Sequence, residues 1–136
     1  MFEEAARFHG HLGPFLILGC RMGLIARKKL RPKGIHDLQA LVRVSMRTPF
    51  SCVLDGIQFS SSCTLGKGNL KVVDSAGKAI ETRFSNEKTG SWIRIKVKEE
   101  IVDKLLKMDG FYGVRLLMRL SDEEIFSIEG NEGNRG

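Results

Sequence analysis

The spacing of hydrophobic positions changes along the chain, and each change predicts a new element. A short amphipathic helix is expected over 3–8. Pro14 has the fixed φ that suits the first position of a helix, and the segment 14–30 ends in a turn rich in cations, which the helix dipole favours. The segment 38–46 alternates apolar and polar residues, as a half-buried strand does. The first third therefore predicts two helices followed by a strand.

Strand patterns dominate the middle of the chain. Thr48 and Pro49 fit an N-cap and a first helical position, so a helix is expected over 50–60. Three further runs have the composition of strands joined by turns, at 70–73, 79–84 and 92–97. Polar and apolar side chains alternate in the last of them, which leaves one face of an antiparallel meander exposed to solvent.

The C-terminal part returns to helical spacing. A helix is expected over 98–108, whereas the run 111–120 is short, apolar and ambiguous. Ser121 fits the start of a capping box, ahead of an edge strand over 125–128. Glycine and asparagine are frequent in 130–136, which predicts a flexible tail.

These elements predict a single α+β domain over 1–129. Its antiparallel meander would be covered by the long N-terminal helix and by the further helices. Gly19 and Gly23 are four residues apart and share one helix face, where another backbone could come close. That backbone could belong to the sheet of the same chain or to a second copy.

Composition and charge narrow the class of protein. The longest apolar run, 15–18, is far too short for a membrane span, and the acidic start Glu3-Glu4 is unlike a signal peptide, so we expect a cytoplasmic protein. The net charge is +6, but the cations are interleaved with acids and no aromatic-studded basic ribbon is present. We therefore expect no nucleic-acid partner and no membrane partner.

The three cysteines include no C-x-x-C pair, which favours free thiols or metal ligands over a disulfide framework. Cys52 falls in the first turn of a predicted helix, where the dipole would lower the pKa of its thiol. Cys63 follows in a loop of serines and a threonine, where we expect it to be exposed enough to ligate or attack. Cys20 lies among apolar residues and is expected to be inert.

Two histidines precede the long helix. In an extended segment His9 and His11 point the same way, which suits metal ligation, an acid–base pair or ordinary hydrogen bonding. A metal site needs three or four ligands, and Cys63, Cys52 and Asp55 are the candidates to complete it.

Two further charged residues need a partner or a role. Asp55 shares a helix face with Cys52, and a carboxylate there would need a histidine, a metal or Lys67 beside it, or else the amides of the neighbouring loop. Lys67 stands between two glycines but lacks the spacing of an ATP-binding loop. It could hold an anionic small molecule, or simply be solvated in a turn.

Three segments together resemble the E-subunit family of formylmethanofuran dehydrogenase. The family patterns are F-H-G-H-x-C-P-G, C-x-x-D-A-I-Q and G-C-T-x-G-K-G-N-L. This chain has Phe8 to Phe15, Cys52 to Gln58 and Ser62 to Leu70 in the same order and spacing. One departure bears on metal binding: Gly13 stands where the family has cysteine, which removes a thiolate ligand and should weaken the site or change its metal.

The resemblance implies an α+β domain that forms a homodimer, stands alone or joins a larger oxidoreductase complex, and carries a metal site. We expect a divalent metal, zinc first, on His11 and Cys63. His9, Cys52, Asp55 and Lys67 would be the catalytic residues, with His9 and Asp55 orienting groups or exchanging protons and Lys67 holding an anionic group. No cysteine follows Cys63, so we expect none of the C-terminal zinc fingers that some members carry.

Two alternatives belong to other classes. The chain could be a non-catalytic dimeric interaction module with a decayed metal site. It could also be a thiol enzyme that uses Cys63 as nucleophile and His9 or His11 as base, in which case Cys63 would be alkylated rapidly at neutral pH.

Overall fold

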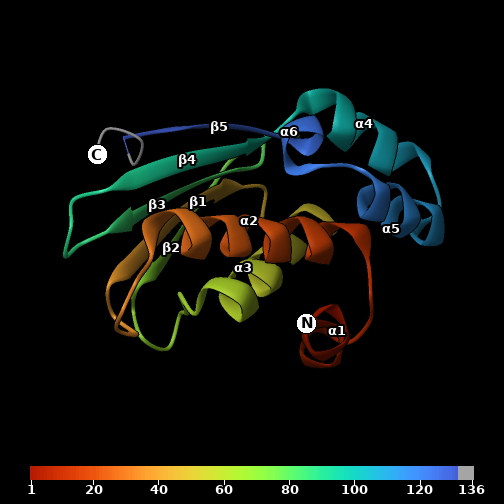
Figure 1. The fold of residues 1–136 in the computed structure, drawn as a ribbon. Coiled ribbons are helices and arrows are strands. Elements are labelled where there is room, and N and C mark those ends of the chain that lie inside the picture. Colours follow the sequence, from red (N-terminus) through yellow and green to blue (C-terminus); the bar gives the residue numbers. More distant parts are fainter. Residues whose placement is uncertain (132–136) are drawn as a thin grey trace.

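The computed structural model describes residues 1–131, which form a five-stranded sheet flanked by helices (Figure 1). Its elements are α1 (Phe2–His9), α2 (Pro14–Leu30), β1 (Leu38–Val44), the 3-10 helix η1 (Phe50–Cys52), α3 (Val53–Ser61), β2 (Leu70–Asp74), β3 (Glu81–Asn86), β4 (Trp92–Val97), α4 (Glu99–Lys107), α5 (Gly110–Arg119), α6 (Asp122–Ile125) and β5 (Phe126–Gly130). The expected α+β class is confirmed. The ambiguous run 111–120 is helical, and the helix expected over 50–60 begins as a 3-10 turn.

The sheet has the strand order β2-β1-β3-β4-β5 and is antiparallel except at one pair. Strands β1 and β2 run parallel, with Ala40 opposite Leu70 and Val44 opposite Asp74. The prediction of a fully antiparallel meander is therefore wrong at the β2 edge of the sheet. The physical reason is that α3 lies between β1 and β2 in the chain, and a helical crossover returns the chain in the same direction.

Helix α2 lies along the inner face of the sheet, as expected (Figure 1). Its apolar side chains and the inward residues of the strands form one buried core. The largest fully buried side chains include Leu18, Met22, Ile57, Phe84, Ile93 and Ile95. Burial of this kind contributes about 25 cal/mol per Å² of apolar surface and holds the helices that carry the site.

Glycines allow α2 and α3 to touch at their backbones. A Cβ added at Gly19 would lie 2.1 Å from the Val53 carbonyl oxygen, and one added at Gly56 would lie 2.3 Å from the Leu16 carbonyl oxygen. Gly23 faces Ser60 in the same seam. The backbone that comes close to Gly19 and Gly23 is thus that of α3. It belongs neither to the sheet nor to a second copy, the two partners that the sequence suggested.

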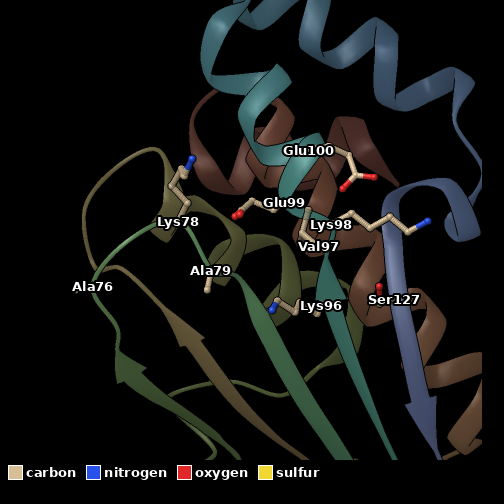
Figure 2. A pocket seen from close by; sticks show the side chains of 9 residues that line it. All are labelled: Ala76, Lys78, Ala79, Lys96, Val97, Lys98, Glu99, Glu100 and Ser127. Atoms are coloured by element: carbon tan, nitrogen blue, oxygen red, sulfur yellow. The ribbon is translucent and has the colours of Figure 1, made fainter.

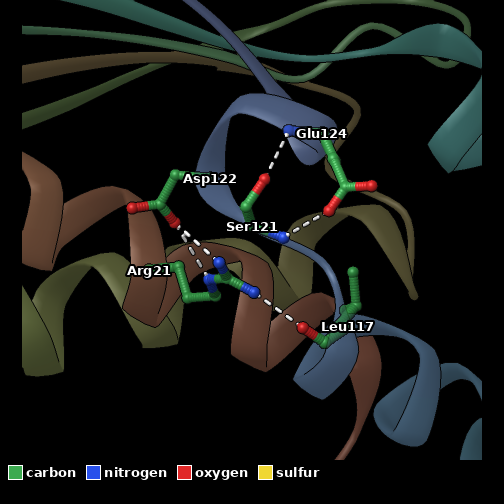
Figure 3. A network of polar contacts seen from close by, with 5 residues as sticks. All are labelled: Arg21, Leu117, Ser121, Asp122 and Glu124. Carbon is green, nitrogen blue, oxygen red and sulfur yellow. Dashed lines mark hydrogen bonds and ion pairs between the residues drawn. The ribbon is translucent and has the colours of Figure 1, made fainter.

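Arg21 of α2 forms hydrogen bonds with the C-terminal helices α5 and α6 (Figure 3). The Arg21 guanidinium donates to the Asp122 carboxylate at 2.7 Å and to the Leu117 carbonyl oxygen at 2.6 Å. The expected capping box is confirmed, because the Ser121 hydroxyl accepts from the Glu124 N–H and the Glu124 carboxylate accepts from the Ser121 N–H. These contacts hold α5 and α6 against α2.

The last strand extends slightly further than the sequence predicts. Strand β5 reaches Gly130, and the Asn131 side chain accepts from the Trp92 N–H at 2.7 Å, so these two residues are paired with β4. The rest of the expected tail, 132–136, lies outside the described residues. Within residues 1–131, no helix has the length and apolar character needed to cross a bilayer.

Candidate functional site

A hollow of about 350 Å³ opens beside the loop that joins α1 to α2. One wall is formed by the end of α1, the following loop and the η1 turn, and the other by the α4–α5 hairpin. Its lining residues are His9, His11, Gly13, Pro14, Phe15, Leu16, Pro49, Cys52, Leu105, Leu106, Met108 and Gly110. The walls are mostly apolar, with two imidazoles and one thiol as the polar groups. We call it the His9 hollow.

A second hollow, of about 340 Å³, lies on the other side of His9 and Cys52. It is bounded by α3, by the parallel strand β2 and by the loop after β1. Its lining residues are His9, Met46, Thr48, Ser51, Cys52, Leu54, Asp55, Gln58, Leu65, Leu70 and Val72. His9 and Cys52 thus form the partition between two hollows.

His9 and Asp55 form the tightest polar contact of the site. Nδ1 of His9 lies 2.5 Å from Oδ2 of Asp55, and the two side chains are 12% and 39% exposed. His9 is the last residue of α1 and Asp55 lies in the first turn of α3, so two helix ends bring them together. Asp55 therefore has a histidine as its partner, one of the options that the sequence left open.

The contact determines how the imidazole is protonated. A carboxylate can only accept, so Nδ1 of His9 carries the proton and donates it to Asp55. Nε2 of the neutral ring then keeps its lone pair. His9 is equipped to accept a proton or to ligate a cation at Nε2.

His11 stands beside His9 but is exposed, with 5.2 Å between the two ring centroids. Gly13 lies directly against it. A Cβ built at Gly13 would sit 3.1 Å from Nε2 of His11. A side chain at position 13 would consequently reach the imidazole, and in this chain the position is bare.

Two of the three thiols do not match the expectations for them, whereas Cys20 is buried as expected. Burial, and secondarily the Asp55 carboxylate, raises the pKa of Cys52, so the predicted lowering by the helix dipole is wrong. Cys63 is 0% exposed and lines neither hollow, so the expectation of an exposed loop thiol is wrong too. Burial also raises the pKa of Cys63, and that of Cys20 to about 11, so both are poor nucleophiles.

Lys67 closes the turn after α3. Its ammonium donates to the Ser62 carbonyl oxygen and, at 3.2 Å, to Oγ1 of Thr64. Asn69 completes the turn by accepting from the Thr64 N–H at 2.8 Å and donating to the Leu38 carbonyl oxygen. Lys67 lines neither hollow, so the structure does not bring it to His9 or Asp55.

Comparison with known families identifies the family of this chain. The family described as "FmdE, Molybdenum formylmethanofuran dehydrogenase operon" matches residues 8–127. The chain belongs to the FmdE family. The match covers α2, α3, the sheet up to the start of β5, and all the lining residues of the His9 hollow.

A longer relative comes from Archaeoglobus fulgidus and is named "Probable S-adenosyl-L-methionine-binding protein". It is 30% identical to this chain over 138 residues, which cover 95% of this chain and 33% of that protein. The chain therefore spans about a third of the length of this relative.

The donor set of this FmdE domain does not complete a metal site. Within residues 1–131, no group of three or more His, Cys, Asp and Glu side chains is placed to hold a metal ion. The predicted ligands His11 and Cys63 are separated, because His11 lines the hollow and Cys63 is packed in the core. His9, His11 and Cys52 share the lining of the His9 hollow but do not form such a group.

Sequence reasoning missed the wall made by the α4–α5 hairpin. Leu105, Leu106, Met108 and Gly110 line the hollow although they lie far from the His and Cys segments in the chain. Pro14 packs against Gly113 of α5, where an added Cβ would lie 3.1 Å from the proline ring. Helical spacing alone could not reveal which face of this hairpin would meet His9.

Alkylation should reach one thiol of the folded FmdE domain. With iodoacetamide at neutral pH, we expect Cys52 to react more slowly than an ordinary exposed thiol, and Cys20 and Cys63 to react only on unfolding. Because the pKa of Cys52 is raised, its rate should keep increasing as the pH rises above neutral. Peptide mapping by mass spectrometry checks this, and rapid labelling of Cys63 would restore the thiol-enzyme hypothesis.

Proposed function

We propose that this FmdE domain binds a small molecule in the His9 hollow and that His9, held by Asp55, exchanges a proton with it. The observation that carries the proposal is the 2.5 Å contact between Nδ1 of His9 and Oδ2 of Asp55 at the edge of the hollow. A positioned imidazole with a free Nε2 is a general base, and its conjugate acid returns the proton.

Asp55 serves this exchange in two ways. It fixes the tautomer and the orientation of the ring, and its negative charge stabilises the imidazolium that forms when Nε2 takes a proton. The apolar walls around Phe15, Leu105 and Met108 limit the water that competes for that proton. His9 is the proton-exchanging group in this scheme and Asp55 is a positioning residue.

The lining also indicates the character of the ligand. An apolar body would pack against the α4–α5 wall, while a polar group would meet His9, His11 and Cys52. The name of the Archaeoglobus relative makes S-adenosyl-L-methionine the first small molecule to test.

A divalent metal, zinc first, is the second candidate for the same hollow. The favouring observation is again the His9–Asp55 contact, because a carboxylate on the far nitrogen of a histidine is the usual support of a metal ligand. Because residues 1–131 hold no group of three His, Cys, Asp or Glu side chains placed for a metal ion, His9 would supply one donor at Nε2, and donors outside these side chains would have to complete the ligand set. This chain's part would be to supply the His9 donor and to fix its ring through Asp55.

Removal of the Asp55 charge should weaken whichever ligand binds. Titration calorimetry with S-adenosyl-L-methionine, and separately with zinc, is expected to give one-to-one binding of at least one of them. Asp55→Asn should weaken zinc binding about tenfold, since losses of 10–100-fold are typical when a metal-ligating histidine loses its supporting carboxylate. Binding of S-adenosyl-L-methionine should weaken too, because the His9 ring loses its fixed tautomer. Asp103→Asn is the matched control, because Asp103 pairs with Lys78 away from the hollow. Failure of both ligands to bind the parent protein would contradict the proposal.

We also propose that the domain works in an assembly, either as a homodimer or within a larger oxidoreductase complex. Large apolar side chains are chain neighbours of lining residues and are themselves exposed. Phe8 and Phe59 pack together beside His9 and Gln58, and Phe111 and Tyr112, which follow Gly110, are 61% and 63% exposed. Such side chains are common where a partner docks. Light scattering of the purified protein distinguishes a dimer from a monomer.

A further inference from the structure

The outer face of the sheet has a charge pattern that the site does not use. Alternation along the strands sends core residues to the α2 side and polar residues to the opposite side. No described helix packs on this opposite side, whose cations and single aromatic residue are Arg43, Lys71, Arg83, Trp92, Arg94 and Lys96. We call it the outer sheet face.

Basic side chains on this face are largely unpaired. Arg94 pairs with the Glu129 carboxylate and lies 3.7 Å from that of Glu81. Among residues 1–131, the other four cations of the face have no carboxylate within ion-pair distance: Arg43, Lys71, Arg83 and Lys96. Four exposed cations on neighbouring strands therefore have no ion pair of their own, although Arg43 and Lys96 both stand opposite Glu81 in the strand register.

The single tryptophan of the chain lies among them. The Arg83 guanidinium is 4.4 Å from the centre of the Trp92 ring, and that of Arg94 is 5.7 Å away. Arg83 and Arg94 also stand directly opposite each other on β3 and β4. Like charges in opposite register repel each other, and the contacts of both guanidiniums with Trp92 and of Arg94 with two glutamates offset that repulsion.

We infer that the outer sheet face docks an acidic protein surface, whose carboxylates pair with Arg43, Lys71 and Arg83, with Trp92 beside Arg83 at one end of the face. Tryptophan and arginine are the residue types that most often dominate the energy of protein interfaces. Arginine binds carboxylates through two parallel hydrogen bonds, which gives geometry as well as charge. Complementary charge would also accelerate the encounter.

Two hollows border this face, and the larger lies at the end of the sheet, where the loop before β3 meets the start of α4 (Figure 2). A hollow of about 470 Å³ includes Lys96 and Ser127, and a neighbouring one of about 340 Å³ shares these two residues. Lys78 and Lys98 line the larger hollow but are engaged, by Asp103 and by the Glu123 carbonyl oxygen. Lys96 is the cation of these hollows without an ion pair, and carboxylates line them too: Glu99 and Glu100 the larger, Glu81 and Glu129 the smaller.

Charge argues against two other occupants. In a two-fold dimer through this face the same cations would meet their own copies, which is repulsive. A nucleic acid would bring phosphates beside Glu81 and Glu129, and Trp92 is the one aromatic residue of the face on which a base could stack. An acidic protein can place separate carboxylates at the cations on either side of Glu81, which stands between Arg43 and Lys96.

The test uses Trp92 fluorescence, since this residue reports directly from the face. The probes are short poly-L-glutamate and an oligo-thymidylate of similar charge, titrated at low and moderate salt. We expect poly-L-glutamate to perturb Trp92 and to bind more weakly as salt increases. The double variant Arg43→Glu, Arg83→Glu should weaken it at least about tenfold.

Lys104→Glu, Lys107→Glu is the matched control, with the same change of net charge on α4, away from the face. Arg43→Gln, Arg83→Gln gives a milder test should charge reversal disturb folding. Absence of poly-L-glutamate binding, or equal losses in the face and control variants, would overturn the inference. Tighter binding of the oligo-thymidylate that depends on Arg43 and Arg83 would overturn it in favour of a nucleic-acid surface.

Discussion

Gly56→Ala is expected to lower the free energy of unfolding by about 3 kcal/mol, at the upper end of what overpacking costs. The added Cβ would lie 2.3 Å from the Leu16 carbonyl oxygen and 2.6 Å from the Cys20 nitrogen. Both are backbone atoms of α2, so relief requires the two helices to separate. The gain in helix propensity, about 1 kcal/mol for glycine to alanine, offsets only part of this.

Denaturant unfolding followed by circular dichroism measures the effect. Gly66→Ala is the control, because its Cβ would meet nothing within 4 Å and its backbone is not left-handed. We expect the control to remain within about 0.5 kcal/mol of the parent. Equal stability of Gly56→Ala and the parent would mean that α2 and α3 do not approach as described, and the placement of Asp55 would fall with it.

Gly13→Cys is expected to raise the affinity for zinc at least about tenfold, because it adds a thiolate where the donor set is incomplete. The new Cβ would lie 3.1 Å from Nε2 of His11, so the thiol would stand beside this imidazole. Gly13 is the N-cap of α2 with extended backbone angles, which a side chain tolerates. It is also the position where the family pattern has cysteine.

Zinc calorimetry, with cobalt absorption as a check on thiolate coordination, measures this change. Gly13→Ser controls for size, since a hydroxyl of similar volume is a poor zinc ligand. The combination with His11→Ala should abolish the gain. An equal gain from serine, or a gain that survives loss of His11, would show that zinc binds elsewhere.

The sequence alone predicts the elements better than their arrangement. Local rules of capping and periodicity predict several elements correctly. Examples are the 14–30 helix, the capping box at Ser121 and the edge strand that follows it. The parallel pairing of β1 and β2 could not be predicted this way, because strand direction depends on the path of the crossover through α3.

The site could be predicted only in part, for the same reason. The spacing around His9 and Asp55 marks both as candidates, but only the fold joins them, since they come from different helices. For Cys63 the local sequence predicts the wrong environment. Its serine-rich neighbourhood predicts exposure, yet the Ser61 hydroxyl accepts from its N–H and turns the chain inward, so the thiol is buried.

The most direct test of the central claim is a long-range ¹H–¹⁵N correlation spectrum of the His9 imidazole, assigned with His9→Gln. We predict a proton on Nδ1 and a free Nε2, loss of this fixed tautomer in Asp55→Asn but not in Asp103→Asn, and a shift of Nε2 when the ligand found by calorimetry is added. A proton on Nε2 in the parent protein, or an Nε2 signal unchanged at saturating ligand, would contradict the account.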